Sequence, residues 1–149
     1  LLRTDPERVA RCLRMLDTRT SLGAVVDSPD AAVSVVQPLL LGRETEALVG
    51  VALDRRNRVV AVEILTTGSH GYCVVDPPHV LRWALTRARP VAGLILAHNH
   101  PSGTPTPSRA DEAVTASVKT TLALIDVVVL DHIVTAGGSS VSMAEQGLI

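Results

Sequence analysis

An uncharged apolar run at residues 91–97, VAGLILA, limits the folds open to this chain more than any other feature. Seven consecutive apolar residues match the length of a β-strand, and a strand without polar alternation is typically buried on both faces. Burying both faces of a central strand requires other elements, such as helices, packed against the sheet. The 149 residues are 46% apolar but only 1% aromatic, so one core built mainly from Val, Leu, Ile and Ala is expected.

Sequence patterns predict four helices around this strand. Each shows a capping residue or a proline at its start and apolar residues at helical spacing. The predicted starts are Thr4, Ser28, Pro77 and Ser108. The second helix is expected to end at Gln37, because Pro38 should stop it, the third near residues 89–90, and the fourth near Leu124.

Further strands are predicted on either side of the central one. Residues 46–54 and 58–67 are β-branched, partly alternating runs joined by the turn residues 54–57, so they should pair as an antiparallel hairpin. A short strand is expected at residues 72–75, and two more at 127–135 and 140–142. The pattern as a whole predicts a mixed α/β (α+β) fold, with helices packed against a mixed sheet.

Composition indicates the expected cellular location and the classes of partner that this chain would bind. The formal net charge is −1, and the few aromatic residues offer no stacking platforms, so nucleic acid is not the expected partner. Cys12 and Cys73 lie too far apart for a C-x-x-C pair and form no disulfide framework, which favours a cytoplasmic location. No apolar run approaches the roughly 18 residues that cross a bilayer, so no membrane partner is expected. The chain begins with Leu1, which is typical of a piece of a longer product.

The chemistry is concentrated where the apolar run ends, in the segment AHNHPSGTPTPSRAD at residues 97–111. Strand alternation would point His98 and His100 to the same side and Asn99 to the other. The following loop is stiffened by three prolines and delivers Ser108 and Asp111 at the start of a helix. Asp111 could complete an open His-His-Asp set, which with a water is typical of a catalytic zinc site.

A simpler interpretation explains part of the same segment. Ser108 and Asp111 also form S-x-x-D, a near capping box, so helix capping alone accounts for both residues without a metal. An isolated H-x-H is also more often a pair of hydrogen-bonded histidines than a metal site. The combination of two histidines after a buried strand, a loop of defined length, a serine and an aspartate favours the metal.

The pattern H-x-H-x7-S-x2-D, formed by His98, His100, Ser108 and Asp111, resembles the JAMM signature of the JAB/MPN zinc metallopeptidases. The longer HNHPSG segment, LDRRNRVV at residues 53–60 and LDHI at residues 130–133 are similar to the RadC branch of that superfamily. The resemblance implies a cytidine-deaminase-like JAB/MPN domain over residues 28–149. Residues 1–27 would be an N-terminal helical extension, because they do not resemble the helix-hairpin-helix segment that usually precedes this domain.

The resemblance also implies a catalytic glutamate on the first strand of the domain. RadC sequences place it eight positions before the Asp of the LDxxN turn, which is Glu46 here, with Glu44 as the fallback. Without the resemblance, Glu46 would be interpreted as a strand-end surface charge. No comparable argument supports Glu63 as the catalytic glutamate, because it lies in the middle of its predicted strand. Two positions depart from the family pattern: Ala47 replaces a usual Phe, and His79 a usual Arg.

The implied activity is zinc-dependent hydrolysis of a peptide or isopeptide bond. Zn²⁺ would be held by His98, His100 and Asp111, Glu46 would be the general base, and Ser108 would donate to the oxyanion. The implied partner is a peptide or protein, with ubiquitin-like proteins among those that JAMM enzymes cleave. Two alternatives stay open: a DNA-repair accessory role, suggested by the naming of RadC, and a non-catalytic scaffold of the MPN kind. His132 matches the family's D-H pair and is expected to be a hydrogen-bonded residue in the core or behind the metal ligands.

Overall fold

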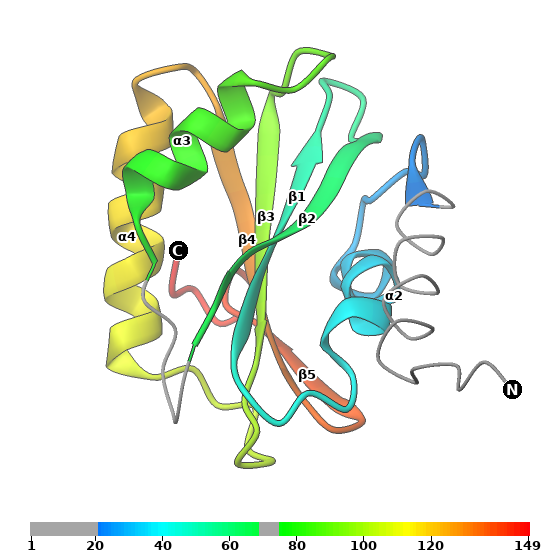
Figure 1. Ribbon diagram of the computed structural model, residues 1–149, viewed down its shortest axis with the longest axis vertical. Coiled ribbons are helices and arrows are strands. Elements are labelled where there is room, and N and C mark those ends of the chain that lie inside the picture. The colour runs from blue at the N-terminus through cyan, green and yellow to red at the C-terminus, as the bar shows by residue number, and fades with distance from the viewer. Residues whose placement is uncertain (1–20, 69–74) are drawn as a thin grey trace, which may run out of the picture.

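The computed structural model describes residues 21–68 and 75–149, and these form a five-stranded sheet between helices (Figure 1). The strand order is β2-β1-β3-β4-β5, with β3 in the centre. Helix α2 covers one face of the sheet, and α3 and α4 cover the other (Figure 1). The strands are β1 (Ala47–Leu53), β2 (Val59–Thr67), β3 (Gly93–Asn99), β4 (Val128–Ala136) and β5 (Ser139–Ser142). The helices are α2 (Pro29–Leu40), α3 (Pro77–Leu85) and α4 (Arg109–Ala123).

The sheet is mixed, as the sequence predicted. β1 pairs antiparallel with both β2 and β3, β3 pairs parallel with β4, and β4 pairs antiparallel with β5. The apolar run that contributes most of β3 is buried on both faces, which confirms the central position expected for it. Two apolar clusters fill the space on either side of the sheet, one beneath α2 and one beneath α3 and α4.

The β1–β2 hairpin confirms the predicted pairing and its turn. Asn57 has a φ of 55°, a left-handed conformation that asparagine tolerates better than most residues. The Asp54 carboxylate accepts hydrogen bonds from the backbone N–H groups of Arg56 and Arg58, at 2.8 and 3.0 Å. This side chain therefore holds the turn closed.

Two predicted helix ends are wrong. Helix α2 continues past Pro38 to Leu40, because Leu39 and Leu40 are buried against the sheet, and their burial outweighs the hydrogen bond that the proline removes. Helix α3 ends at Leu85, well before residues 89–90. The side chains of Thr86 and Arg87 bond the carbonyl oxygens of its last turn and so end the helix early.

Helix α4 and strands β4 and β5 lie where the sequence predicted them, within one or two residues. The helix predicted from Thr4, both cysteines and nearly all of the strand expected at residues 72–75 lie outside the described residues. Among the helices of the described ranges, none combines the length and apolar character that a membrane span requires.

Candidate metal centre

The two histidines of the H-x-H pattern lie at the carboxyl end of β3. His98 is in the strand and buried, and His100 follows its last residue, with its backbone N–H donating to the Thr135 carbonyl at 2.7 Å. Asn99 points to the opposite face, where its Oδ1 accepts from the Ala47 N–H at 2.8 Å. The alternation expected from the sequence is therefore present. Asn99 also joins the start of β1 to the end of β3.

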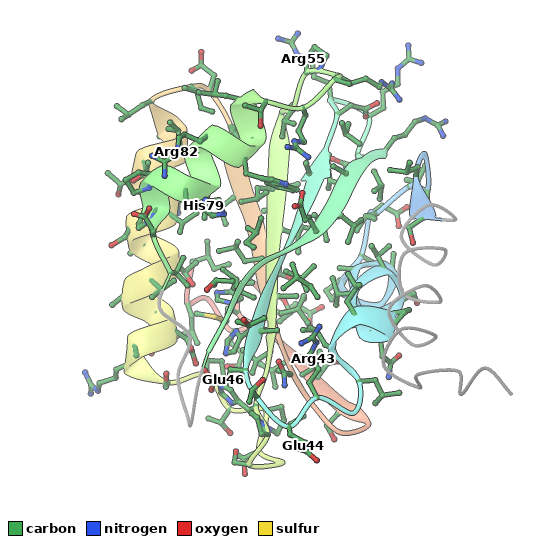
Figure 2. The ribbon with its side chains drawn as sticks, in the orientation of Figure 1. Arg43, Glu44, Glu46, Arg55, His79 and Arg82 are labelled. Atoms are coloured by element: carbon green, nitrogen blue, oxygen red, sulfur yellow. The ribbon has the colours of Figure 1, made fainter. Side chains whose placement is uncertain are left out.

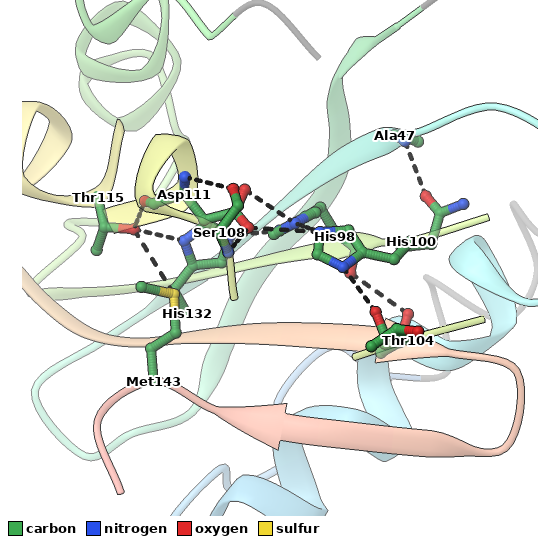
Figure 3. Close-up of polar contacts among 11 residues, drawn as sticks. Ala47, His98, His100, Thr104, Ser108, Asp111, Thr115, His132 and Met143 are labelled. Atoms are coloured by element: carbon green, nitrogen blue, oxygen red, sulfur yellow. Dashed lines mark hydrogen bonds and ion pairs between the residues drawn. The ribbon is translucent and has the colours of Figure 1, made fainter. Parts of the chain in front are cut away.

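The structure brings Asp111 to both imidazoles (Figure 3). The Nε2 atoms of His98 and His100 are 2.9 Å apart. Asp111 Oδ1 lies 3.2 Å from the first of these nitrogens, and Oδ2 lies 3.4 Å from the second. One ligand atom from each of the three residues lies within 4.8 Å of the others, as a shared cation would require.

Asp111 also caps its own helix. Its Oδ2 accepts from the Ser108 backbone N–H at 2.7 Å, and the Ser108 Oγ accepts in return from the Asp111 backbone N–H at 3.1 Å. Capping and metal binding are therefore compatible, because the capping box holds the carboxylate toward the histidines. Burial opposes ionisation of Asp111, but the neighbouring His98 side chain and the hydrogen bond from the Ser108 backbone N–H outweigh it and keep the pKa of Asp111 below its ordinary value of 3.8.

His100 presents a lone pair to this cluster. Its Nδ1 lies 2.9 Å from the Thr104 carbonyl oxygen, and a carbonyl can only accept, so Nδ1 carries the hydrogen. The Nε2 of a neutral His100 is then free of hydrogen and faces His98 and a carboxylate. Two imidazole nitrogens and a carboxylate oxygen form a donor set that suits a divalent metal such as zinc.

Behind His98 lies a second pair of polar residues, His132 of β4 and Thr115 of α4. The Nε2 of His132 is 2.7 Å from the Nδ1 of His98, and its Nδ1 is 2.6 Å from the Thr115 Oγ1. Burial, together with the neighbouring His98, lowers the pKa of His132 to about 3, so this imidazole is neutral near pH 7. His132 is thus a hydrogen-bonded core residue, as expected. The sequence analysis missed Thr115, although its position four residues after Asp111 places it on the same helix face.

The three candidate ligands open into a cavity of about 440 Å³. Both candidate bases, Glu44 and Glu46, and the predicted oxyanion donor Ser108 also line this cavity. Figure 2 shows the two glutamates at the end of the molecule where β1 begins. Part of the remaining wall is apolar, formed by Leu48, Val75, Ala110 and Val114.

Strand pairing explains the position of Glu46. Leu48 of β1 lies opposite His98 of β3. Glu46 comes one residue before β1 and not within it as predicted, but its carbonyl accepts the Gly68 N–H at 2.8 Å and so continues the pairing. Its side chain, two residues before Leu48, therefore points to the same face of the sheet. Glu44 is exposed and lies three residues before β1, so strand alternation does not orient its side chain. Glu63 is engaged elsewhere, since its Oε2 accepts from the Trp83 Nε1 at 2.6 Å.

The two departures from the family pattern lie away from the ligands. Ala47 is buried in the cluster beneath α2, on the opposite face of the sheet from His98, so its side chain does not line the cavity. His79 is exposed on α3 and borders an adjoining cavity of about 250 Å³, which shares Leu48 and Val75 with the first but none of the candidate ligands.

Comparisons with known proteins give a family match and several similar relatives. A family model described as "RadC-like JAB domain" matches residues 26–148. A UPF0758 protein of Verminephrobacter eiseniae is 46% identical over 126 residues, which cover 85% of this chain and 52% of the relative. UPF0758 proteins of Acidovorax sp. and Nitrosomonas eutropha are 47% and 43% identical, over 84% and 91% of this chain and 52% and 60% of the relatives. The chain thus spans about half the length of the curated relatives it matches.

Proposed function

The chain belongs to the family of RadC-like JAB domains, and on this premise we propose that it is a zinc-dependent hydrolase of the JAMM type that cleaves a peptide or isopeptide bond. One observation carries the proposal. Two imidazole nitrogens and a carboxylate converge at the wall of a cavity that also holds a glutamate and a serine hydroxyl. These are the groups that metal-assisted amide hydrolysis uses.

His98, His100 and Asp111 would hold the metal. Three protein ligands of this kind are typical of catalytic rather than structural zinc sites. When bound, zinc would supply Lewis acidity, lowering the pKa of an associated water and polarising the carbonyl under attack. Strand β3, the residue that follows it and the capped start of α4 position these three side chains next to one another.

Glu46 would move the proton. Glu46 lines the same cavity as His98 and immediately precedes β1, in which Leu48 lies opposite His98. It would accept a proton from the attacking water and return it to the leaving amine, as a general base and then a general acid. Glu44, further from the strand, would be a surface carboxylate of the entrance.

Ser108 would stabilise the negative charge that develops on the carbonyl oxygen. Its Oγ accepts the Asp111 N–H, which orients the side chain and leaves the hydroxyl hydrogen to be donated. A single donor of this type contributes roughly 3 kcal/mol in other enzymes. The apolar wall formed by Leu48, Val75 and Val114 would contact an apolar portion of a peptide or protein substrate.

Metal content and peptide hydrolysis together test the proposal. We expect about one zinc per chain by mass spectrometry, and cleavage of members of a peptide and isopeptide library that stops on chelation and returns with Zn²⁺. His100→Gln should lose both metal and activity. His79→Gln removes another histidine of the domain, so it controls for metal bound nonspecifically and should keep the metal.

The same measurements separate the two alternatives. A scaffold of the MPN kind would show no hydrolysis even with the metal bound, and a DNA-repair accessory protein would bind DNA without cleaving peptides. A wild-type protein that takes up no zinc would contradict the proposed function.

A further inference from the structure

We propose that Thr115 and His132 are positioning residues that hold His98 in the tautomer required of a metal ligand, through a one-directional chain of hydrogen bonds. The proposal rests on the proposed metal site, because it concerns which nitrogen of His98 is free to bind. It assigns a role to two residues that are not among the candidate metal ligands.

The chain of hydrogen bonds begins at a backbone carbonyl in helix α4. The Thr115 Oγ1 lies 2.6 Å from the carbonyl oxygen of Asp111. Two oxygen atoms this close require a hydrogen between them, and a carbonyl has none to give, so the threonine hydroxyl is the donor. The Thr115 Oγ1 also lies 4.0 Å from the Met143 sulfur, which is a weak acceptor and does not compete with the carbonyl.

The next links follow from the number of hydrogens available. The Thr115 hydroxyl donates its single hydrogen to the Asp111 carbonyl. Its 2.6 Å contact with the Nδ1 of His132 therefore requires a hydrogen on that nitrogen, with Thr115 as the acceptor. A neutral His132 with a hydrogen on Nδ1 has a lone pair on Nε2. That lone pair faces the Nδ1 of His98 at 2.7 Å, so His98 must be the donor in this contact.

The last link reaches the metal site. A neutral His98 with its hydrogen on Nδ1 has no hydrogen on Nε2, the atom that faces His100 and Asp111. His100 reaches the same state independently, through the Thr104 carbonyl. In neutral rings both Nε2 atoms, which lie 2.9 Å apart, therefore carry lone pairs, and a cation held with Asp111 would take the place of a hydrogen between them. The hydrogen-bond chain thus links two candidate ligands, from the backbone carbonyl of Asp111 to the ring of His98.

Burial protects this direction from solvent. His98 is 3% exposed, His132 1% and Thr115 1%, so bulk water has little access to these side chains. An unpaired hydrogen-bonding group in such a place is costly. The three side chains come from β3, β4 and α4, so the tautomer of His98 depends on how these elements pack.

Thr115→Val removes the start of the chain while keeping the shape of the side chain. The Nδ1–H of His132 then has no acceptor, and the opposite tautomer, with the hydrogen on Nε2, becomes favoured. That hydrogen would point at the Nδ1 of His98 and move the His98 hydrogen to Nε2. There it can donate to Asp111, 3.2 Å away, and it occupies the atom that the metal needs. Thr115→Ser keeps the hydroxyl and should restore the original direction.

The first measurement reads the tautomers directly, in metal-free protein, from imidazole ¹⁵N chemical shifts. In the wild type we expect hydrogen on Nδ1 of both His98 and His132. Thr115→Val should move the His98 hydrogen to Nε2, and Thr115→Ser should not. Wild-type protein with the His98 hydrogen on Nε2 would overturn the proposal without any variant.

The second measurement is titration of the metal-free protein with Zn²⁺ alone. Thr115→Val should weaken binding by about 10- to 100-fold, the range typical of lost partners of metal-binding histidines, and Thr115→Ser should bind like the wild type. Thr120→Val is the matched control. Thr120 makes the same type of hydroxyl-to-carbonyl bond within α4, to Ala116 at 3.0 Å, but is exposed and remote from the site.

The results distinguish this inference from the proposed function. If the wild type binds no zinc, the proposed function fails, while the ¹⁵N shifts still decide the direction of the chain. If the wild type binds zinc and folded Thr115→Val binds it equally well with an unchanged His98 tautomer, the proposed function stands and the positioning role is wrong.

Discussion

The side chains and backbones of Ser108 and Asp111 bond each other reciprocally at the start of α4, at 2.7 and 3.1 Å. The same Asp111 carboxylate lies 3.2 Å from the Nε2 of His98. A local helix cap thus orients a candidate metal ligand. Substitutions of Asp111 can separate its contribution to helix stability from its contribution to metal binding.

Asp111→Asn and Asp111→Ala should differ in stability but not in metal binding. The Asn side chain keeps an oxygen that can accept the Ser108 N–H, whereas Ala loses that bond and should destabilise the metal-free protein by roughly 1 kcal/mol more. Both should lose zinc, because both lose the carboxylate. Denaturant unfolding with chelator and metal analysis measure the two effects, and Glu112→Ala, an acidic residue of the same helix turn, is the control. Zinc retained by Asp111→Ala would show that Asp111 is only a cap.

Glu46→Gln should keep the fold and the zinc content while lowering turnover by roughly 10² to 10⁴, since a general base contributes about that much. The glutamine has the same shape but cannot accept the proton. Glu44→Gln should change little, because Glu44 is exposed and lies three residues before β1, whereas Glu46 is half-buried and immediately precedes it. Steady-state kinetics on a library peptide that the wild type cleaves would compare the turnover of the two variants. If only Glu44→Gln abolishes turnover, the base is Glu44.

Ser108→Ala should lower kcat by roughly 10²-fold, because it removes a hydrogen-bond donor to the oxyanion. It should also cost about 1 kcal/mol of stability through the lost cap. Ser28→Ala is matched to it, since Ser28 caps α2 through the Ala31 N–H at 3.2 Å and is not part of the cavity lining. Equal effects of both substitutions on kcat would reduce the role of Ser108 to capping.

Duplex DNA should bind this domain weakly, and added salt should abolish the binding. The formal net charge is −1, so few phosphate contacts are available, apart from local clusters such as Arg55, Arg56 and Arg58. Fluorescence anisotropy at several salt concentrations measures this. Tight and sequence-selective binding that resists salt would favour the DNA-repair alternative over the hydrolase.

Asp54 should make stability depend on pH in the acid range. The hydrogen bonds from the backbone N–H groups of Arg58 and Arg56 hold the pKa of this carboxyl below its ordinary value of 3.8 in the folded protein. The contribution of Asp54 to the free energy of unfolding is therefore complete above about pH 3.8, and it is lost as the pH falls through the pKa that Asp54 has in the folded protein. Asp54→Asn mimics the protonated side chain, so its destabilisation in urea should be largest near neutral pH and shrink in acid. A difference that stays constant with pH would contradict this.

Much of the fold follows from neighbouring residues. The apolar run of β3, the β1–β2 hairpin with its LDRRN turn, and the start of α4 at Ser108 were each predicted from short segments, because periodicity and capping act over a few positions. The two errors have the same origin. Pro38 and residues 86–89 were judged by local preference, whereas the burial of Leu39 and Leu40 and the side-chain bonds of Thr86 and Arg87 decided where α2 and α3 end.

The candidate site divides in a similar way. Strand alternation predicted that His98 and His100 share one side, and the capping pattern placed Asp111 one turn into a helix, so these three side chains were recognisable in one segment of 14 residues, from 98 to 111. The side chains around them belong to distant parts of the chain. Glu46 reaches the cavity only because β1 pairs with β3, and His132 reaches His98 only because β4 packs beside β3 and beneath α4. Contacts between residues 34 or 52 positions apart depend on strand order, register and helix packing, which no local pattern contains. The sequence by itself therefore determined the three candidate metal ligands. Only the tertiary structure decided which residues form hydrogen bonds around them.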